Sequence, residues 1–407
     1  MNKFLKEFKD RGFFYQCTDE NELSSLLDKK KMRAYIGFDC TAESLHVGSL
    51  LQIMCLRNLQ KHGHQPIVLL GGGTTRIGDP SGKDKTRKIL SEEEIESNIK
   101  NIEIILKKFL ITDNKNVAPI FVNNYTWLKN LNYIDFLRDI GKHFTINKML
   151  SFDSVKLRLD REQSLSYMEF NYMILQAYDF LELNRTENCL LQIGGSDQWG
   201  NIVNGVDLIK RYSSKEVYGL TTELITLASG SKMGKTENGA IWLDKKLLSI
   251  FDYWQFWRNT DDRDVLKFLK MFTDLNADKI NEISKKEINL QKIELANETT
   301  AMLHGKDAAL EVEEIAKHSF SENSSGAYLP NLKINKSNID KDLINLISNV
   351  EKKLSKSEIR RLIKSSGIKI NNETVTDEKF IITSELMREK NFIKLSVGKK
   401  RHYKIVI

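Results

Sequence analysis

The sequence is poor in the residues and patterns that mark secreted, membrane-spanning or zinc-binding proteins. It has only 4 prolines and 4 cysteines in 407 residues, and Cys17, Cys40, Cys55 and Cys189 are too widely spaced to form a C-x-x-C pair. Neither a disulfide framework nor a metal site is therefore predicted. No run approaches the roughly 20 apolar residues of a membrane helix, and the N-terminus lacks the apolar core of a signal peptide. We expect a cytoplasmic protein that does not bind membranes.

Charge is nearly balanced along most of the chain, but the C-terminal end is basic. Residues 351–407 contain 15 lysines and arginines against 7 acidic residues, a net charge of +8, whereas the whole chain carries +7. The first 350 residues therefore sum to −1. A small basic appendage on a neutral body favours a polyanionic partner. A tail that is basic only for solubility is the alternative.

The apolar runs of the N-terminal half predict an α/β domain of the nucleotide-binding type. Residues 33–39 and 67–73 are typical of buried strands, and apolar residues between positions 48 and 62 recur at helical spacing. A strand, a helix and a strand in succession form a βαβ unit, which implies a parallel sheet. Three further elements are predicted: a helix that Ser91 and Glu94 open with a capping box, a long helix near 165–182 and a strand at 189–195.

Beyond residue 247 the pattern becomes helical, and Ser, Asn, Gly and Pro then cluster as in a linker. The predicted limits are 1–235 for the α/β domain, 236–325 for a helical domain, 326–345 for a linker and 346–407 for a small basic domain.

The basic domain is predicted to pair two helices with a strand-rich end. The helices lie near residues 340–349 and 357–366, and Ser355 and Glu358 form a capping box before the second helix. Gly367 stands where a helix end favours a left-handed residue. One basic stripe follows this helix at every fourth residue, through Lys356, Arg360 and Lys364.

Three glycine-rich segments fail to match the standard phosphate-binding loops. The run Gly71-Gly72-Gly73 follows a strand, but Arg76 occupies the third glycine position of the dinucleotide fingerprint. The segments that begin at Gly78 and Gly230 are each one residue shorter than a Walker A loop. Neither a dehydrogenase nor a P-loop nucleotidase is therefore indicated.

Two other segments carry side chains suited to phosphate. The segment HVGS (46–49) lies where a strand turns into a helix, and a helix N-terminus favours phosphate through its free N–H groups and its dipole. Lys232 and Lys235 lie on a glycine-containing loop, where two ammonium groups can follow the charge of a transferred phosphoryl group. An ordinary polar cap and a solvated basic turn are the respective alternatives.

A third group lies on one face of a helix. Tyr172, Gln176 and Asp179 are spaced i, i+4 and i+7, so they share one side of an otherwise apolar helix. Burying a phenol, an amide and a carboxylate in a row is costly unless a polar group meets them. The polar segment 194–201 follows a strand, at the edge where parallel α/β sheets bind ligands. The alternative is a helix end whose own side chains satisfy one another.

The order of these motifs closely resembles that of the bacterial tyrosyl-tRNA synthetases. The matching segments are YIGFD, TAESLHVGS, GDPSGK, NNYTW, GKHF, YMILQAYDF, QIGGSDQWGN and KMGKT, followed by NTDDRDVLKFLKMFT at 259–273. HVGS and KMGKT correspond to the two signatures of class I synthetases, and the resemblance covers nearly the whole chain. It implies a Rossmann-like, parallel-sheet catalytic domain of the α/β class, then an α-helical domain and a small α+β domain similar to the S4 RNA-binding type.

The resemblance also implies roles for individual residues. Tyr35 and Asp179 match residues that hold the substrate phenol, and the tyrosine site comprises Tyr35, Asp79, Tyr172, Gln176, Asp179, Gln192 and Gln198. The ATP site comprises Gly37, Asp39, Thr41, His46, Gly48, Ser49, Gly195, Asp197, Lys232 and Lys235. The catalytic groups that engage the phosphates are His46, Lys83, Arg87, Lys232, Lys235 and Thr236. The implied tRNA contacts are Lys356, Arg360 and Lys364.

Two positions depart from the general class I pattern. Ser49 stands where many relatives have the second histidine of the first signature; serine still donates a hydrogen bond, although a weaker contact is expected. Gly234 stands where the general second signature has serine, and glycine is common there in the tyrosine branch. His46 is retained.

The resemblance implies a two-step reaction. The carboxylate of L-tyrosine attacks the α-phosphorus of ATP, giving tyrosyl-adenylate and pyrophosphate, and the terminal ribose of tRNA(Tyr) then attacks the adenylate. ATP acts as a substrate with Mg²⁺, and no protein nucleophile or tightly bound cofactor is needed, because positioning and charge stabilisation supply the catalysis. The implied partners are tRNA rather than DNA and a second copy of the chain in a homodimer.

Three alternatives share parts of this pattern. A tryptophanyl-type synthetase has the same fold and signatures, but Tyr35 and Asp179 suit a phenolic hydroxyl better than an indole. A non-catalytic RNA-binding relative would use the same surface without chemistry, although every activation residue except the second histidine is present. A nucleotidyltransferase without tRNA is disfavoured by the basic C-terminal domain.

Overall fold

The chain folds into two compact units, Met1–Ala309 and Leu310–Ile407. The computed structural model describes residues 2–81, 90–230, 233–236, 239–320, 331–333, 342–350, 354–383, 385–386, 392–398 and 401–406. Within these ranges, no helix is long and apolar enough to cross a membrane.

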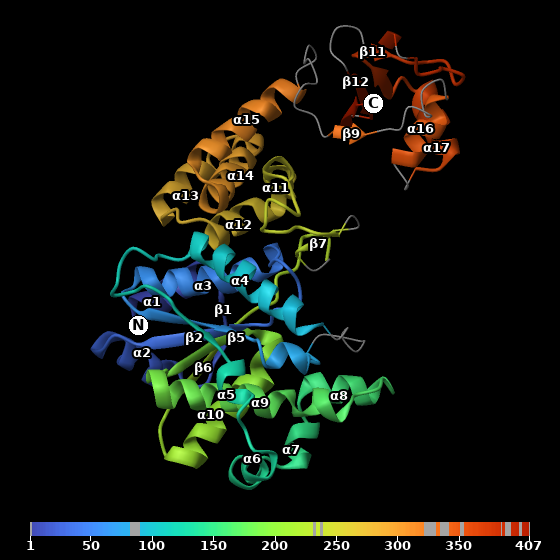
Figure 1. The fold of residues 1–407 in the computed structure, drawn as a ribbon. Helices are drawn as coiled ribbons and strands as arrows, with labels where there is room; N and C mark the ends of the chain where they lie inside the picture. The colour runs from blue at the N-terminus through green and yellow to red at the C-terminus, as the bar shows by residue number, and fades with distance from the viewer. Residues whose placement is uncertain are drawn as a thin grey trace. The chain divides into compact units, whose positions relative to one another are not determined.

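The first unit is built on a six-stranded sheet in the order β1-β6-β5-β2-β3-β4 (Figure 1). The strands are β1 (Phe14–Cys17), β2 (Arg33–Phe38), β3 (Gln65–Leu70), β4 (Ile120–Asn123), β5 (Leu191–Gly195) and β6 (Tyr218–Thr222). Strand β1 runs antiparallel to β6, and the other neighbours are parallel. The predicted βαβ unit is confirmed, because β2 and β3 pair in parallel from Arg33↔Gln65 to Phe38↔Leu70.

The strand order changes direction between β2 and β5. From β2 the sheet continues through β3 to β4 on one side, and through β5 to β6 on the other. In open α/β sheets, the crevice at the carboxyl ends of the strands on either side of such a switch point is where ligands bind. The sheet therefore locates a site before any side chain is considered.

Helices cover both faces of this sheet. Figure 1 shows α3 (Leu50–Lys61) and α4 (Glu92–Phe109) on one side, and α9 (Tyr167–Glu187) and α10 (Trp199–Ser213) on the other. The predicted capping box opens α4, and a second one, which was not predicted, opens α9 at Ser166 and Glu169. The remaining helices are α1 (Lys3–Asp10), α2 (Glu20–Lys29), α5 (Tyr125–Leu128), α6 (Tyr133–Asp139), α7 (Ile146–Leu150) and α8 (Asp153–Asp160).

The predicted helical pattern beyond residue 247 is confirmed. Helices α11 (Ile250–Arg258), α12 (Val265–Phe272), α13 (Ala277–Ser284) and α14 (Ile288–His304) belong to the first unit, while α15 (Lys306–Phe320) spans the division between the units. Trp257 of α11 is fully buried, and its ring contacts those of Phe268 and Phe272 of α12. The limits at residues 235, 325 and 345 stay predictions.

The second unit pairs two helices, α16 (Leu343–Val350) and α17 (Lys356–Lys364), with a five-stranded sheet. In sheet order the strands are β11 (Glu373–Thr374), β10 (Ile368–Ile370), β12 (Ile393–Val397), β13 (Arg401–Val406) and β9 (Asn331–Lys333). Ile347 of α16 and Ile359 of α17 are fully buried in one apolar core with residues of β10, β12 and β13. The two helices and the strand-rich end are therefore confirmed.

The end of α17 differs from the prediction. The capping box at Ser355 and Glu358 is present, but the left-handed residue is Ser366 (φ 58°), not Gly367. Because the helix ends at Lys364, two residues before the predicted end, the left-handed position falls one residue earlier. Gly367 instead donates its N–H to the carbonyl of Leu362 at 2.8 Å.

Candidate active site

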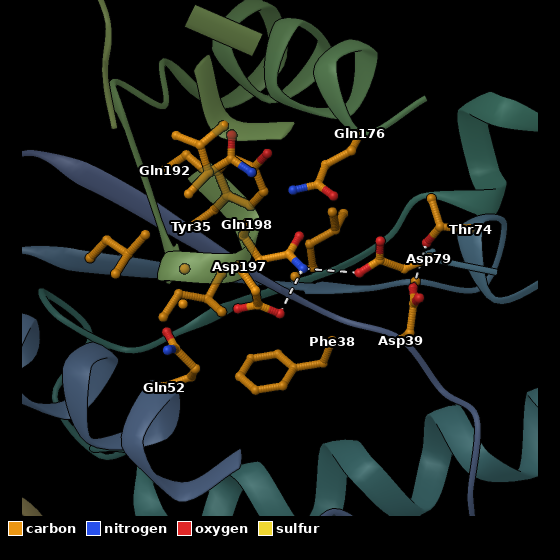
Figure 2. A pocket seen from close by; sticks show the side chains of 18 of the residues that line it. Tyr35, Phe38, Asp39, Gln52, Thr74, Asp79, Gln176, Gln192, Asp197 and Gln198 are labelled. Carbon is orange, nitrogen blue, oxygen red and sulfur yellow. Dashed lines mark hydrogen bonds between the residues drawn. The ribbon is translucent and has the colours of Figure 1, made fainter. Parts of the chain in front are cut away.

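A cavity of about 340 Å³ lies at the switch point between β2 and β5 (Figure 2). Its volume is in the range of small-molecule sites. The predicted residues that line it are Tyr35, Gly37, Asp39, Gly48, Ser49, Asp79, Tyr172, Gln176, Asp179, Gln192, Gly195, Asp197 and Gln198. Thr41 and His46 do not line it; Thr41 is exposed and His46 is half-buried.

The polar face of α9 meets this cavity as predicted, and its innermost carboxylate is held by two donors. Asp179, only 1% exposed, accepts the side-chain N–H of Asn124 at 2.9 Å and the indole N–H of Trp127 at 2.8 Å. Burial raises the pKa of Asp179 to about 7, while these two hydrogen bonds act to lower it. The carboxyl group therefore stands near the midpoint of its titration at neutral pH.

Three buried polar atoms of the residues that line the cavity have no hydrogen-bond partner among the described residues: the hydroxyl of Tyr35, Oε1 of Gln192 and Oε1 of Gln52. Tyr35 and Gln192 are paired residues on the neighbouring strands β2 and β5. Burial, and then the charge of Asp179, raises the pKa of Tyr35, so its hydroxyl stays protonated and able to donate. Leaving a buried polar group unpaired costs about 1–3 kcal/mol. The cavity is therefore suited to a ligand that carries a polar group of its own.

Carboxylates gather around the rest of the cavity. Tyr172 donates to Asp39 at 3.1 Å, and Gln198 donates to Asp79 at 2.9 Å and to Asp197 at 3.4 Å. Figure 2 shows the Gln198 amide between Asp79 and Asp197. A cavity lined by several carboxylates favours a cation such as the ammonium group of an amino acid.

The first signature forms a short 3-10 helix, η1 (Val47–Ser49), which leads into α3. His46 caps it, because its Nδ1 accepts the N–H of Gly48 at 3.0 Å. The neutral imidazole therefore carries its proton on Nε2, the tautomer that can donate to a phosphate oxygen.

The segment that follows the second signature docks on the first signature through the backbone. The N–H of Val47 donates to the carbonyl of Ile241, and the N–H of Leu243 donates to that of Leu45, both at 2.9 Å. Gly234 lies within this contact with φ +97°, and a Cβ there would lie 2.7 Å from the nitrogen of Gly48. The absence of serine at this position is thus explained by the close approach of the two signatures.

Of the predicted phosphate-binding residues on the loops, the structure describes only the backbone of two. Lys235 and Thr236 form strand β7 (Lys235–Thr236), which pairs with β8 (Gly239–Ala240), and their side chains are not described. Lys83, Arg87 and Lys232 lie outside the described residues.

Two family models match nearly the whole chain. The model described as tRNA synthetases class I (W and Y) matches residues 27–321, and the model described as tyrosine–tRNA ligase SYY-like C-terminal domain matches residues 323–406. The tyrosine–tRNA ligase of Pelagibacter ubique (strain HTCC1062) is 73% identical over 407 residues, covering 100% of this chain and 99% of that protein. The tyrosine–tRNA ligase of Wolbachia pipientis subsp. Culex pipiens (strain wPip) is 52% identical over 412 aligned residues, covering 100% of this chain and 98% of that protein. The chain belongs to the tyrosine–tRNA ligases.

Solved structures agree with this membership. A C-terminally truncated mitochondrial tyrosyl-tRNA synthetase from Aspergillus nidulans has a TM-score of 0.70 and 31% identity, covering 78% of this chain and 94% of that chain. The tyrosyl-tRNA synthetase of Archaeoglobus fulgidus, at 16% identity and a TM-score of 0.56, shares the fold. The class I synthetase fold and the ligation of tyrosine to tRNA, with ATP as a substrate, are therefore established over the tryptophanyl and non-catalytic alternatives.

Several side chains of this tyrosine–tRNA ligase site are absent from the sequence-based assignment. Asn124 and Trp127, which hold Asp179, belong to the NNYTW segment, which was matched without a role. Thr74 and Gln52 line the cavity. A signal was present for the first two, because NNYTW follows the apolar run of β4 at the edge of the sheet where ligands bind.

In the second unit, the predicted basic stripe lies along the exposed side of α17. Lys356, Arg360 and Lys364 are all exposed. Arg360 and Lys364 both approach Glu378, at 3.6 Å and 3.1 Å respectively. Exposed ion pairs contribute little to stability, so these cations can exchange Glu378 for a stronger anion.

Proposed function

We propose that the cavity binds L-tyrosine with its phenol between Tyr35 and Asp179. The observation that carries this placement is the buried hydroxyl of Tyr35, which has no partner among the described residues although Asp179 is close enough for its charge to affect it. A substrate hydroxyl would accept from Tyr35 and donate to Asp179, satisfying both groups at once. The remaining tyrosine contacts are Asp79, Tyr172, Gln176, Gln192 and Gln198, whose carboxylate, phenol and amide oxygens suit the ammonium group.

ATP is proposed to lie beside tyrosine, next to η1. Its contacts are Gly37, Asp39, Thr41, His46, Gly48, Ser49, Gly195, Asp197, Lys232 and Lys235. The proton on Nε2 of His46 donates to a phosphate oxygen, and Lys83, Arg87, Lys232, Lys235 and Thr236 engage the pyrophosphate as it leaves. The described residues contain no group of three or more His, Cys, Asp or Glu side chains placed to hold a metal. The Mg²⁺ is proposed to enter the site with ATP.

The reaction follows from this placement. The tyrosine carboxylate attacks the α-phosphorus while the cavity holds the two reactants in contact, and the cationic groups stabilise the charge on the departing pyrophosphate. The terminal ribose of tRNA(Tyr) then attacks the adenylate.

A homodimer is proposed from an apolar patch on the first unit, which we call the α6–α9 patch. It is formed by Tyr133, Ile134 and Leu137 of α6, Ile146 and Leu150 of α7, Leu157 and Leu159 of α8, and Tyr167 and Met168 of α9. These side chains are 37–68% exposed. Helices α6, α7 and α8 gather at the end of this unit far from α11–α14 (Figure 1). Exposed apolar patches of this kind favour a protein partner, and a second copy of the chain is the commonest one.

The C-terminal unit is proposed to be an S4-like RNA-binding domain that contacts tRNA through Lys356, Arg360 and Lys364. Its two helices, its sheet and the net charge of the tail support this role. The domain limits that we propose are those given above: a catalytic domain over 1–235, a helical domain over 236–325, a linker over 326–345 and the RNA-binding domain over 346–407.

The placement of tyrosine is tested by pyrophosphate–ATP exchange without tRNA, using each of the twenty amino acids. Wild-type protein should exchange efficiently with tyrosine alone, and only weakly with phenylalanine at high concentration. Tyr35→Phe should lower kcat/KM for tyrosine about tenfold, as expected for one lost hydrogen bond to a buried group, while leaving exchange with phenylalanine unchanged. An equal loss with both amino acids would mean that the hydroxyl of Tyr35 does not meet the phenol.

A further inference from the structure

The glycine run 71–73, which matches no phosphate loop, makes room for the side chains around it. A Cβ on Gly71 would lie 2.6 Å from Oγ1 of Thr74 and would overlap Oδ1 of Asp39. A Cβ on Gly73 would lie 3.2 Å from Oδ1 of Asn124. The run therefore allows three polar side chains, which come from different parts of the sheet, to meet at its backbone.

These side chains form a chain of hydrogen bonds between two carboxylates. The hydroxyl of Thr74 donates to Asp39 at 2.8 Å and accepts an N–H of Asn124 at 3.0 Å. The same amide nitrogen donates to Asp179 at 2.9 Å. Its oxygen accepts the N–H of Gly73 at 2.7 Å. Thr74 is 3% exposed and Asn124 is fully buried, so water does not compete for these bonds.

The direction of each bond is determined by its neighbours. Both N–H groups of Asn124 are committed, one to Asp179 and one to Thr74, and its oxygen is held by the backbone. A threonine hydroxyl has a single proton. Because the oxygen of Thr74 accepts from Asn124, its proton is directed to Asp39.

We propose that Thr74 is a positioning residue, which ties the carboxylate of Asp39 to that of Asp179. A phenol bound at Asp179 fixes Asn124, Asn124 fixes the hydroxyl of Thr74, and Thr74 holds Asp39 in the orientation that the activation step uses. This inference rests on the proposed place of Asp39 in the ATP site. In this proposal, the segment 71–74 couples the recognition of the amino acid to the activation step.

The test separates tyrosine binding from the rate of adenylate formation in single turnovers. Thr74→Val keeps the shape of the side chain but removes the hydroxyl, and we expect the rate to fall 10- to 100-fold while the tyrosine Kd changes less than threefold. Thr74→Ser restores the hydroxyl and should recover most of the rate. Thr186→Val is the matched control, because Thr186 is exposed and its hydroxyl bonds only within α9. Unfolding midpoints of all variants show whether each protein is folded.

A double-mutant cycle decides whether Thr74 acts through Asp39. In an Asp39→Ala background, Thr74→Val should lower the rate less than twofold further. If the two losses multiply, Thr74 does not position Asp39 and the inference fails, even though Asp39 remains part of the site. If Asp39→Ala alone leaves the rate unchanged, the proposed ATP site is wrong instead. A Thr74→Ser protein as slow as Thr74→Val would also overturn the inference.

Discussion

Trp127 donates its indole N–H to Asp179 at 2.8 Å, on a helix face whose other polar groups also meet the cavity. The two residues are 52 positions apart in the chain, so their contact depends on the fold of the whole sheet. The hydrogen bond favours the ionised form of Asp179, whereas burial favours the neutral form more strongly. The protonation state of this carboxyl group should therefore affect the stability of the free enzyme and, in the proposed placement of the phenol, the binding of tyrosine.

The stability of the free enzyme should change with pH because Asp179 titrates. The pKa of this group is raised in the folded state to about 7, from 3.8 for an ordinary aspartate. Between these values the folded protein binds the extra proton, so this contribution to the free energy of unfolding is complete below about pH 4 and is lost as the pH rises to about 7. The loss is up to about 4 kcal/mol. Asp179→Asn should lack it.

Urea unfolding of wild-type and Asp179→Asn proteins at pH 4.5, 6 and 8 measures this difference. Only the wild type minus variant difference is informative, because the lowered pKa of His64 and His304, about 4 in each case and due chiefly to burial, acts on both proteins alike. A difference that stays constant with pH would contradict the raised pKa.

Tyrosine binding should show the opposite trend. The ionised carboxylate accepts the substrate hydroxyl in a charge-assisted bond, so affinity should increase as the pH rises through about 7. Trp127→Phe removes a hydrogen bond that lowers the pKa of Asp179, and the midpoint of this rise should therefore move to higher pH. Trp254→Phe is the control, because Trp254 makes an indole bond of the same length, 2.8 Å, to Asn297 in the helical region. The measurement is the tyrosine Kd from pH 5.5 to 8.5. If Trp127 does not influence the pKa of Asp179, the wild type and Trp127→Phe would have the same midpoint.

Gly234 should be needed for activation but not for tyrosine binding. A Cβ at this position would lie 2.7 Å from the nitrogen of Gly48 and 2.8 Å from Nδ1 of His46. Gly234→Ala should therefore separate the two signatures and lower the rate of adenylate formation at least tenfold, with the tyrosine Kd unchanged.

The control for this prediction is Gly239→Ala. Gly239 also has a positive φ, +114°, but a Cβ there would meet nothing within 4 Å. Gly239→Ala therefore reproduces the backbone strain of an alanine with positive φ, which costs about 1 kcal/mol. It does so without the collision that a Cβ at position 234 would make with Gly48. Equal losses in the two variants would show that strain, not the docking of the signatures, matters at Gly234.

The sequence is most informative where a pattern is local. The βαβ unit of β2, α3 and β3 and the face of α9 were predicted because apolar periodicity and turn residues are read within one segment. Strands β1, β4 and β6 were not predicted, since their short segments show little apolar alternation. Contacts such as that between Asn124 and Asp179 join distant segments, and no local pattern encodes them.

The resemblance to a family gave most of the cavity residues, but not their partners. Motif matching assigns a role to Asp179, yet the state of its carboxyl group depends on burial and on two donors that carried no assigned role. The same limit applies to Gly234, whose departure from the general signature is explained only by the distance to Gly48.

The α6–α9 patch should hold two subunits together. Ile134 is 68% exposed on α6, and Ile134→Asp should place a charge in the proposed interface and shift the protein from dimer to monomer. Ile104→Asp is the matched control, because Ile104 is 58% exposed on α4, outside the patch. Light scattering coupled to gel filtration gives the masses; a dimer that survives Ile134→Asp, or a monomeric wild type, would remove the patch from the proposal.

Glu378 should compete with tRNA for the basic stripe. It pairs with Arg360 and Lys364, so a phosphate must displace it before those cations can bind RNA. Glu378→Gln should strengthen tRNA binding several-fold, whereas replacing Lys356, Arg360 and Lys364 by alanine should weaken it. The triple variant should also reduce the slope of log K against log salt by up to about 3, roughly one per lost phosphate contact.

Pyrophosphate exchange without tRNA separates the change in tRNA binding from a change in catalysis. The rate of exchange should be the same in Glu378→Gln, in the triple alanine variant and in the wild type. Glu311→Gln is the control for a charge change alone, since Glu311 is exposed on α15 in the same unit. If Glu311→Gln strengthens binding as much as Glu378→Gln, the gain comes from net charge. If neither variant changes binding while the triple variant weakens it, the stripe binds RNA and Glu378 does not obstruct it.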